Sequence, residues 1–143
     1  AYVFNYVFQL FRPNSILLPS AVYSFVDELR RIGPNDLLIA MSISPYTRDV
    51  VRAVRYARAN NARIVAITDD RLSPIAREAD ITLQTTTSTP SFFHSIISMI
   101  AIVQALLALL VARGGKKTLK AIEQSEMQLD WFGAYWNEKQ EKS

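Results

Sequence analysis

The sequence contains no cysteine and a single histidine among its 143 residues. The lack of cysteine excludes disulfide bonds and a thiolate nucleophile, and the lone histidine argues against a structural zinc site. Basic residues exceed acidic ones by only three charges, which is weak support for nucleic-acid binding. The chain does not open with the basic segment and cleavage site of a secretory signal, so we expect a cytoplasmic protein. We also expect no bound metal ion or cofactor.

Half of the residues are hydrophobic, which is enough for one domain with a substantial core. Short apolar runs alternate with stretches whose apolar residues recur at helical spacing, and no hairpin signal separates them. This alternation predicts an α/β fold, with a doubly wound parallel sheet covered by helices on both faces. The predicted strands are residues 15–18, 37–41, 64–68 and 81–85, and the predicted helices are residues 2–11, 21–32, 46–60, 73–79, 92–112 and 118–136.

The most informative stretch runs from Asp36 to Asp49. An apolar strand leads into a turn with three small hydroxyl side chains and then into a helix. A helix start offers unpaired N–H groups and the positive end of the helix dipole, so an anion can bind there. The alternative is that the threonine caps the helix and the serines satisfy the turn backbone. The candidate ligand-binding residues are Ser42, Ser44, Tyr46, Thr47 and Arg48.

Two segments resemble the SIS domain family, the sugar-isomerase and phosphosugar-binding fold. The segment Ser42-Ile-Ser-Pro-Tyr-Thr-Arg-Asp49 is similar to the family's S-x-S-G-x-T-x-(D/E) loop, and Ile67–Asp80 resembles its I-T-D-x-S-P-(L/I)-A-x-x-A-D segment. The subgroup most like this chain is the C-terminal domain of RpiR-type bacterial transcriptional regulators. In that subgroup, a helix-turn-helix domain precedes an SIS domain that senses a sugar phosphate.

The resemblance departs from the family pattern at one position in the loop. Pro45 stands where the family has glycine, and proline lacks a backbone N–H and fixes φ. If the family loop uses that N–H or a positive φ to hold the phosphate, binding here is weakened or re-aimed.

The resemblance also implies a five-stranded parallel core whose first strand is not found in this sequence. That strand would lie between the predicted strands at 15–18 and 37–41, and its loss would leave two rows of backbone groups unpaired, at about 1–3 kcal/mol for each group. We therefore expect residues before Ala1 in the native chain. The predicted domain is an N-terminally incomplete SIS domain over 1–136, followed by a charged tail over 137–143.

Two later segments carry open alternatives. The hydroxyl-rich loop Thr85–Ser91 could close over a sugar or be a solvated connector. The apolar stretch 92–112 approaches the length of a membrane span, but a stretch of this kind after an α/β core is more often a buried helix. We expect it to pack on the sheet and against a second subunit rather than to enter a membrane. The resemblance implies a homodimer or tetramer built by such late apolar helices.

His94 is the only side chain with an ordinary pKa near neutrality, and it is a weak candidate for the base of an aldose–ketose isomerase. A capping or packing histidine at the start of an apolar helix is the more common role. Four arginines of the helix at 46–60 form a basic stripe that could meet DNA, although a solvated helix face is the more common explanation. These arginines are Arg48, Arg52, Arg55 and Arg58.

The sequence and the resemblance together predict a non-catalytic phosphosugar sensor domain of an RpiR-like regulator. A sugar phosphate would bind at the loop, and DNA would be contacted only through a domain that is not in this sequence. One alternative is a sugar-phosphate isomerase that uses His94. A second is a dimerisation module whose site has decayed, which would fit Pro45.

Overall fold

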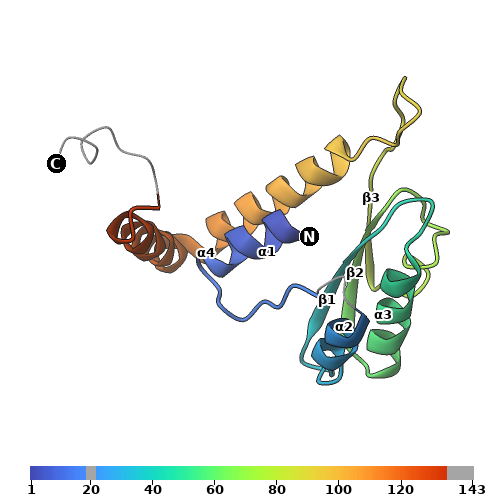
Figure 1. The fold of residues 1–143 in the computed structure, drawn as a ribbon, viewed down its shortest axis with the longest axis horizontal. Coiled ribbons are helices and arrows are strands. Elements are labelled where there is room, and N and C mark those ends of the chain that lie inside the picture. The colour runs from blue at the N-terminus through green and yellow to red at the C-terminus, as the bar shows by residue number, and fades with distance from the viewer. Residues whose placement is uncertain (19–21, 135–143) are drawn as a thin grey trace. The chain divides into compact units, whose positions relative to one another are not determined.

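The computed structural model describes the backbone of residues 1–18 and 22–134, and their side chains except at 22–24. The described chain forms two compact units (Figure 1). The first, which we call the α/β unit, comprises Ile16–Ala105 with Ala1. The second, which we call the helical unit, comprises Tyr2–Ser15 and the residues from Leu106 on.

The α/β unit is built on a parallel three-stranded sheet in the order β1-β2-β3 (Figure 1). The strands are β1 (Leu37–Met41), β2 (Arg63–Thr68) and β3 (Ile81–Gln84). The pairing places Leu38 beside Ile64 and Val65 beside Ile81. The parallel α/β fold predicted from the sequence is therefore confirmed, and each of these strands agrees with its predicted range to within one residue.

The core of the α/β unit lies between the sheet and helix α3 (Arg48–Ala59). Val54 and Ala57 of α3 are fully buried, as is Ile64 of β2. Helix α2 (Val22–Leu29) contacts α3, and Leu29 is buried. Burial of such aliphatic side chains contributes about 1.5–3 kcal/mol each, so this layer fixes where α3 begins relative to the end of β1.

Arg58 and Asp80 join the end of α3 to the start of β3. The Arg58 guanidinium donates to a carboxylate oxygen of Asp80 at 3.1 Å and to the backbone carbonyl of Glu78. The other Asp80 oxygen accepts the Ile64 N–H at 2.7 Å. These bonds, first the backbone N–H and then the guanidinium, lower the pKa of Asp80 below its usual value.

We expect this carboxylate to make folding sensitive to acid. Because the folded-state pKa of Asp80 is lowered, the ionised group stabilises the fold above its unfolded pKa of about 4, and this contribution is lost as pH falls through the folded pKa. Asp80→Asn should therefore lower the melting temperature at pH 7, with a difference that shrinks towards pH 3. Melting curves of both proteins across this range check it, and a difference that does not change with pH would contradict it.

Three predicted elements differ in the structure. Residues 15–18 do not form a strand. Among the described residues β1 pairs only with β2, so the sheet has no neighbouring strand that residues 15–18 could join. Residues 73–79 form turns instead of a helix: the Ser73 hydroxyl accepts the Ala76 N–H at 3.1 Å, but the chain must reach β3 within a few residues. The late apolar helix begins at Ile97 rather than at residue 92, because Ser91 and Ser95 hydroxyls accept nearby backbone N–H groups in turns.

The helical unit contains α1 (Tyr2–Gln9), and the long helix α4 (Ile97–Trp131) enters it at Leu106. Phe4 and Phe8 stack with their ring centroids 5.7 Å apart. The Ser125 hydroxyl donates to the Leu10 carbonyl at 2.8 Å, which satisfies an acceptor just after the end of α1. The helix predicted at 2–11 is thus confirmed, although it ends two residues earlier, at Gln9. Ser20, a candidate N-cap for the predicted helix at 21–32, and Tyr135 and Trp136, at the end of the predicted last helix, lie outside the described residues.

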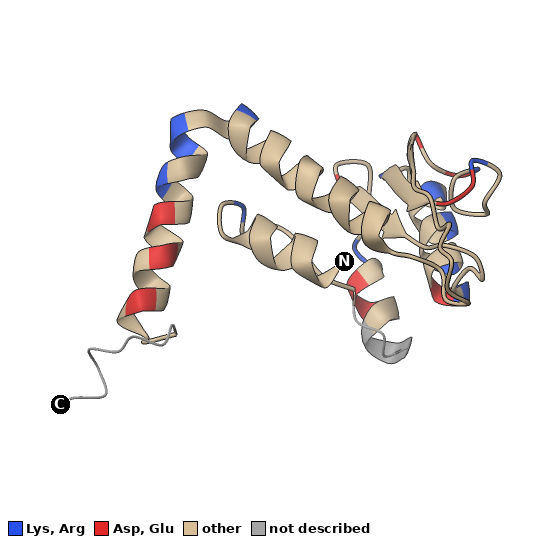
Figure 2. Ribbon diagram, turned by 90° about the horizontal axis from the view of Figure 1, so that it is seen from above, with Lys and Arg blue, Asp and Glu red and all other residues tan. Residues whose placement is uncertain are grey.

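Helix α4 changes direction at Gly115, where the backbone has φ 57° and ψ −148°. The interruption predicted between the helices at 92–112 and 118–136 is therefore present, as a kink at the second of the paired glycines Gly114 and Gly115. Figure 2 shows that the charged residues of α4 begin only near this kink, with lysines before acidic residues. Among the described residues, α4 is the one helix long and apolar enough to cross a membrane.

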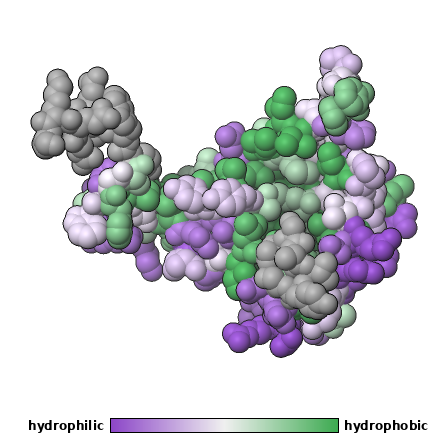
Figure 3. Space-filling view, in the orientation of Figure 1, coloured by the Kyte–Doolittle hydropathy of each residue, from purple (hydrophilic) through white to green (hydrophobic). Residues whose placement is uncertain are grey.

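The apolar part of α4 is largely uncovered by this chain. Only 11% of its most apolar 18-residue window is buried. Hydrophobic side chains also reach the visible surface in Figure 3. The large hydrophobic side chains of α4 that are exposed before the kink are Ile97, Ile100, Leu109 and Leu110.

Candidate functional site

The candidate site lies at the carboxyl ends of the three strands, where the loop after β1 leads into α3. Ser42 opens this loop and is buried, and its N–H donates to the Ile67 carbonyl at 3.2 Å. Its hydroxyl oxygen accepts the Thr47 N–H at 3.2 Å, which closes the loop on itself. The Ser44–Pro45 peptide bond is cis. Ser44 and Thr47 are exposed, so their hydroxyl groups remain available to solvent or a ligand.

Asp69, the first residue after β2, holds the middle of this loop. One oxygen of its carboxylate accepts the Ser44 N–H at 3.2 Å, and the other accepts the Thr68 hydroxyl at 3.2 Å. Burial raises the pKa of Asp69, but hydrogen bonds from the Ser44 backbone, its own backbone, Tyr46 and Thr68 outweigh it, so the pKa is lowered overall. The pKa of Tyr46 is raised by burial and then by its hydrogen bond to Asp69. Asp69 is therefore ionised near neutral pH, with Tyr46 as a neutral donor.

The first turn of α3 has backbone N–H groups that donate no hydrogen bond to the described residues. Thr47 stands at the N-cap position with extended backbone, but its side chain makes no capping hydrogen bond. The N–H groups of Arg48, Asp49 and Val50 have no acceptor among the described residues. The alternative in which the Thr47 side chain caps the helix is therefore wrong, but its other half, in which a serine satisfies the turn backbone, is confirmed for Ser42. Three first-turn N–H groups are left without an acceptor among the described residues.

A cavity of about 950 Å³ lies at the ends of β2 and β3, and it is lined by Asp69, which also bonds to the loop after β1. Asp69 and Asp70 form one wall, and Gln84 donates from its side chain to the Asp69 carbonyl at 3.0 Å. The ends of β2 and β3 and the loop after β3 thus surround one open space. The residues that line it are Asp69, Asp70, Gln84, Thr85, Thr86, Thr87, Ser88, Thr89, Ser91, Phe92, Phe93 and His94.

The loop after β3 is anchored at its base and exposed at its tip. Thr85 is buried and shares a hydrogen bond with the Ser98 hydroxyl, and the Ser95 N–H donates to the Thr87 carbonyl at 3.2 Å. Phe92 and Phe93 pack on each other with ring centroids 4.1 Å apart and are both exposed. Five hydroxyl-bearing residues between Thr85 and Ser95 line the cavity.

The structure gathers the sequence-predicted residues into two groups. Ser42, Ser44, Tyr46, Thr47 and Arg48 share the β1–α3 loop. His94 was expected to open a helix, which is wrong: it lies in the loop after β3, because α4 begins only at Ile97, and it lines the cavity with Asp69.

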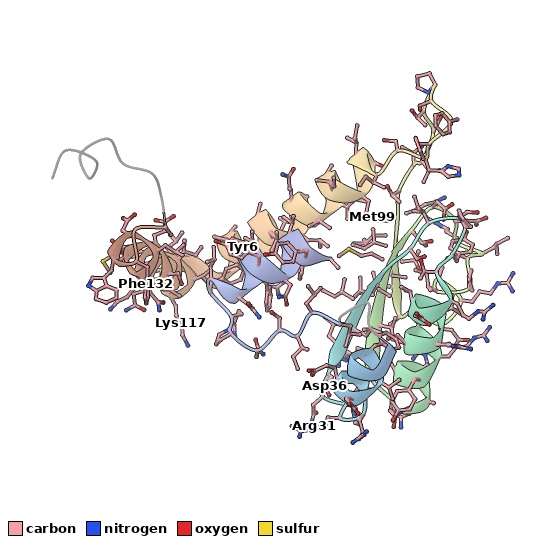
Figure 4. All side chains as sticks on the ribbon, viewed as in Figure 1. Tyr6, Arg31, Asp36, Met99, Lys117 and Phe132 are labelled. Atoms are coloured by element: carbon pink, nitrogen blue, oxygen red, sulfur yellow. The ribbon has the colours of Figure 1, made fainter. Side chains whose placement is uncertain are left out.

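The sequence reasoning missed two residues of this region, Asp69 and Gln84. Their position directly at the ends of strands was the available signal, since ligands of parallel sheets bind at that edge. Figure 4 labels Asp36 at the opposite, amino end of β1, where its carboxylate accepts the Gly33 N–H at 2.9 Å in the turn that enters the strand.

Other charged groups are engaged elsewhere or scattered. Of the basic stripe on α3, Arg58 is bound to Asp80 and Glu78, and Arg52 lies 3.9 Å from Asp49. This favours the solvated-face explanation of the stripe over a DNA contact. Within residues 1–18 and 22–134, no group of three or more histidine, aspartate or glutamate side chains could hold a metal ion.

The comparison with protein families decides the family. The SIS domain model matches residues 1–109, which is most of the chain. The chain belongs to the SIS domain family. No curated protein sequence matches it.

Three solved structures are similar to this chain. The sugar isomerase domain of an RpiR transcription factor from Sphaerobacter thermophilus is 26% identical, with a TM-score of 0.81, over 88% of this chain and 70% of that one. The NanR protein of Vibrio vulnificus, solved in complex with ManNAc-6P, has a TM-score of 0.78 at 15% identity, over 95% of this chain and 52% of that one. A candidate phosphosugar isomerase from Bacillus subtilis is 29% identical, with a TM-score of 0.58, over 90% of this chain and 39% of that one.

Proposed function

We propose that this SIS domain is the phosphosugar-binding sensor domain of an RpiR-like transcriptional regulator in the cytoplasm. The observation that carries the proposal is the arrangement of two hydroxyl-rich loops at one edge of the sheet, on either side of Asp69. The similarity to the RpiR domain and the ManNAc-6P bound by NanR support it.

In this proposal the phosphate binds at the start of α3. The unpaired N–H groups of Asp49 and Val50 donate to it, together with the exposed hydroxyl groups of Ser44 and Thr47. Arg48 is exposed in the same turn and supplies a positive charge. Pro45 removes one backbone donor that the family's glycine would offer, so the side-chain hydroxyls carry a larger share of the contact.

The sugar part then extends into the cavity beside β3. Adjacent strands lie about 4.8 Å apart, so the loops after β1 and β3 are separated by roughly 10 Å, with Asp69 between them. Carboxylate, amide and hydroxyl groups of the cavity wall can accept or donate hydrogen bonds to sugar hydroxyls. The binding residues are therefore Ser44, Thr47 and Arg48 for the phosphate, with Ser42 and Tyr46 holding the loop.

A thermal-shift titration against sugar phosphates tests this site. A ligand that binds the native state raises the melting temperature, and a concentration of 100 times Kd stabilises the fold by about 2.7 kcal/mol. We expect at least one sugar phosphate to raise it and its unphosphorylated sugar not to. The double variant Ser44→Ala/Thr47→Ala should lose most of the shift while keeping its ligand-free melting temperature within a few degrees.

The matched control is Gln124→Ala, which changes an exposed polar residue of α4. It should leave the shift unchanged. A shift that survives in the double variant would place the phosphate elsewhere. If no sugar phosphate shifts the wild-type protein, the domain is a dimerisation module with a decayed site.

The signal is proposed to pass through a homodimer or a larger assembly of this chain. The exposed apolar residues of α4 before its kink support this, because a surface of this kind usually packs against a partner. A ligand that binds two arrangements of the dimer unequally would shift their populations and so reposition attached DNA-binding domains. Sedimentation equilibrium without detergent tests the assembly: a purely monomeric protein, or one that requires detergent, would contradict it.

A sugar-phosphate isomerase is the second candidate. His94 supports it, because this side chain lines the cavity and could act as a base, and the similarity to the Bacillus subtilis protein adds to it. Turnover of an aldose or ketose phosphate that is lost in His94→Ala would favour this function over the sensor.

A further inference from the structure

Asp69 occupies the point where the two halves of the proposed site meet. Its carboxylate bonds to Ser44 in the loop after β1, and its carbonyl accepts from Gln84 at the end of β3. The same residue lines the cavity of about 950 Å³. A ligand that touches both the start of α3 and this cavity must therefore pass beside the Asp69 carboxylate.

This carboxylate is a fixed negative charge. Hydrogen bonds from the Ser44 N–H and the Thr68 hydroxyl, each at 3.2 Å, hold both of its oxygens in place. The same bonds favour its ionised form and lower its pKa. These hydrogen bonds hold the charge beside the cavity, and the lowered pKa favours its ionised form near neutral pH.

The cavity wall contains no lysine or arginine to offset this charge. Of the described residues that line it, the ionisable ones are Asp69, Asp70 and His94. The remaining polar lining consists of hydroxyl groups and one amide. The cavity therefore suits neutral hydrogen-bonding groups, whereas the donors for an anion lie at the start of α3.

We propose that Asp69, together with Asp70, restricts the site to ligands with a single phosphate group. The phosphate goes to the start of α3, and the rest of the ligand lies in the cavity with its hydroxyl groups donating to the carboxylates. A second phosphate at the far end of the sugar would be forced against two like charges. The inference rests on the proposed function, because it concerns the same site and names the class of ligand that the site admits.

The experiment compares matched monophosphates and bisphosphates in direct binding measurements. The probes are fructose 6-phosphate with fructose 1,6-bisphosphate, and glucose 6-phosphate with glucose 1,6-bisphosphate, at pH 8, where histidine is ordinarily neutral. The variants are Asp69→Asn and Asp69→Asn/Asp70→Asn. Asparagine retains a carbonyl oxygen that can accept the Ser44 N–H, so the variants remove charge while keeping this hydrogen bond.

We expect the wild-type protein to bind a monophosphate at least about tenfold more tightly than its bisphosphate, and the double variant to lose most of this preference. The readout is the ratio of the two Kd values within each protein, which a general loosening of the loop does not change. The control Asp130→Asn removes the same charge from an exposed position in α4 and should keep the wild-type ratio.

Equal binding of mono- and bisphosphate by the wild-type protein would overturn the inference while leaving the phosphosugar site intact. A preference that survives unchanged in the double variant would overturn it as well, since the carboxylates would not be its cause. If the wild-type protein binds neither member of either pair, both the inference and the phosphate site at α3 are overturned for hexose phosphates.

Discussion

Replacing Ile64 with alanine is expected to lower the free energy of unfolding by about 2–5 kcal/mol. Ile64 is fully buried in the core cluster with Val54 and Ala57 of α3. Removing its outer carbons leaves a cavity between the sheet and the helix that the parallel strands cannot close. Because a typical domain is stable by only 5–15 kcal/mol, this single change removes a large share of the total. Urea denaturation followed by circular dichroism measures it.

The matched control for Ile64 is Leu72→Ala. Leu72 is 69% exposed in the turn after β2, so its truncation should change the free energy of unfolding by less than about 0.5 kcal/mol. Equal losses for the two variants would mean that α3 does not pack on the sheet as described. The site would then lack the support that fixes the start of α3.

Replacing Gly115 with alanine is expected to cost about 1–3 kcal/mol of stability. Gly115 has φ 57° and ψ −148°, a region that only glycine occupies readily. No heavy atom lies within 4 Å of the position that a Cβ would take, so the cost comes from the backbone conformation and not from a steric clash. Denaturation curves of Gly115→Ala and of the wild-type protein give the difference.

Lys116→Ala is the control for the kink. Lys116 is exposed and lies next to Gly115, and alanine is a good helix former, so this variant should be neutral within about 0.5 kcal/mol. A Gly115→Ala variant that is as stable as the wild-type protein, or more stable, would show that α4 runs straight through this position in solution.

The strands next to the site were the most predictable part of the chain. Leu37–Met41 was predicted with its observed limits, because a short run of apolar residues between a Gly-Pro turn and a serine leaves few alternatives. The strand at 64–68 starts one residue earlier in the structure. The predicted helix at 46–60 begins at Arg48, because Tyr46 and Thr47 are taken up by the loop.

The misplaced elements all depended on contacts that sequence spacing does not contain. Residues 15–18 have strand-like composition, but a strand exists only with a partner, and β1 pairs only with β2 among the described residues. Ser73-Pro74 is a good helix start, yet the polypeptide turns back towards β3 before a helix can form. Phe92 and Phe93 look like core residues, but both are exposed in the loop.

The candidate site was only half visible in the sequence. The hydroxyl groups of Ser42, Ser44 and Thr47 stand close together in the chain, so their shared loop could be predicted. Asp69 lies 25 residues beyond Ser44, and only the parallel pairing of β1 with β2 brings the two together. The roles of Ser42, Ser44, Tyr46, Thr47 and Arg48 in ligand binding stay a prediction.

The most direct test of the phosphosugar site is to record which backbone amides respond to the ligand. In ¹H–¹⁵N correlation spectra of the labelled protein, a sugar phosphate should shift the amide signals of Asp49 and Val50, whose N–H groups are unpaired, together with Thr86 in the cavity wall. The unphosphorylated sugar should leave Asp49 and Val50 unchanged. Shifts confined to the helical unit, or the same response to both compounds, would contradict a phosphate site at the start of α3.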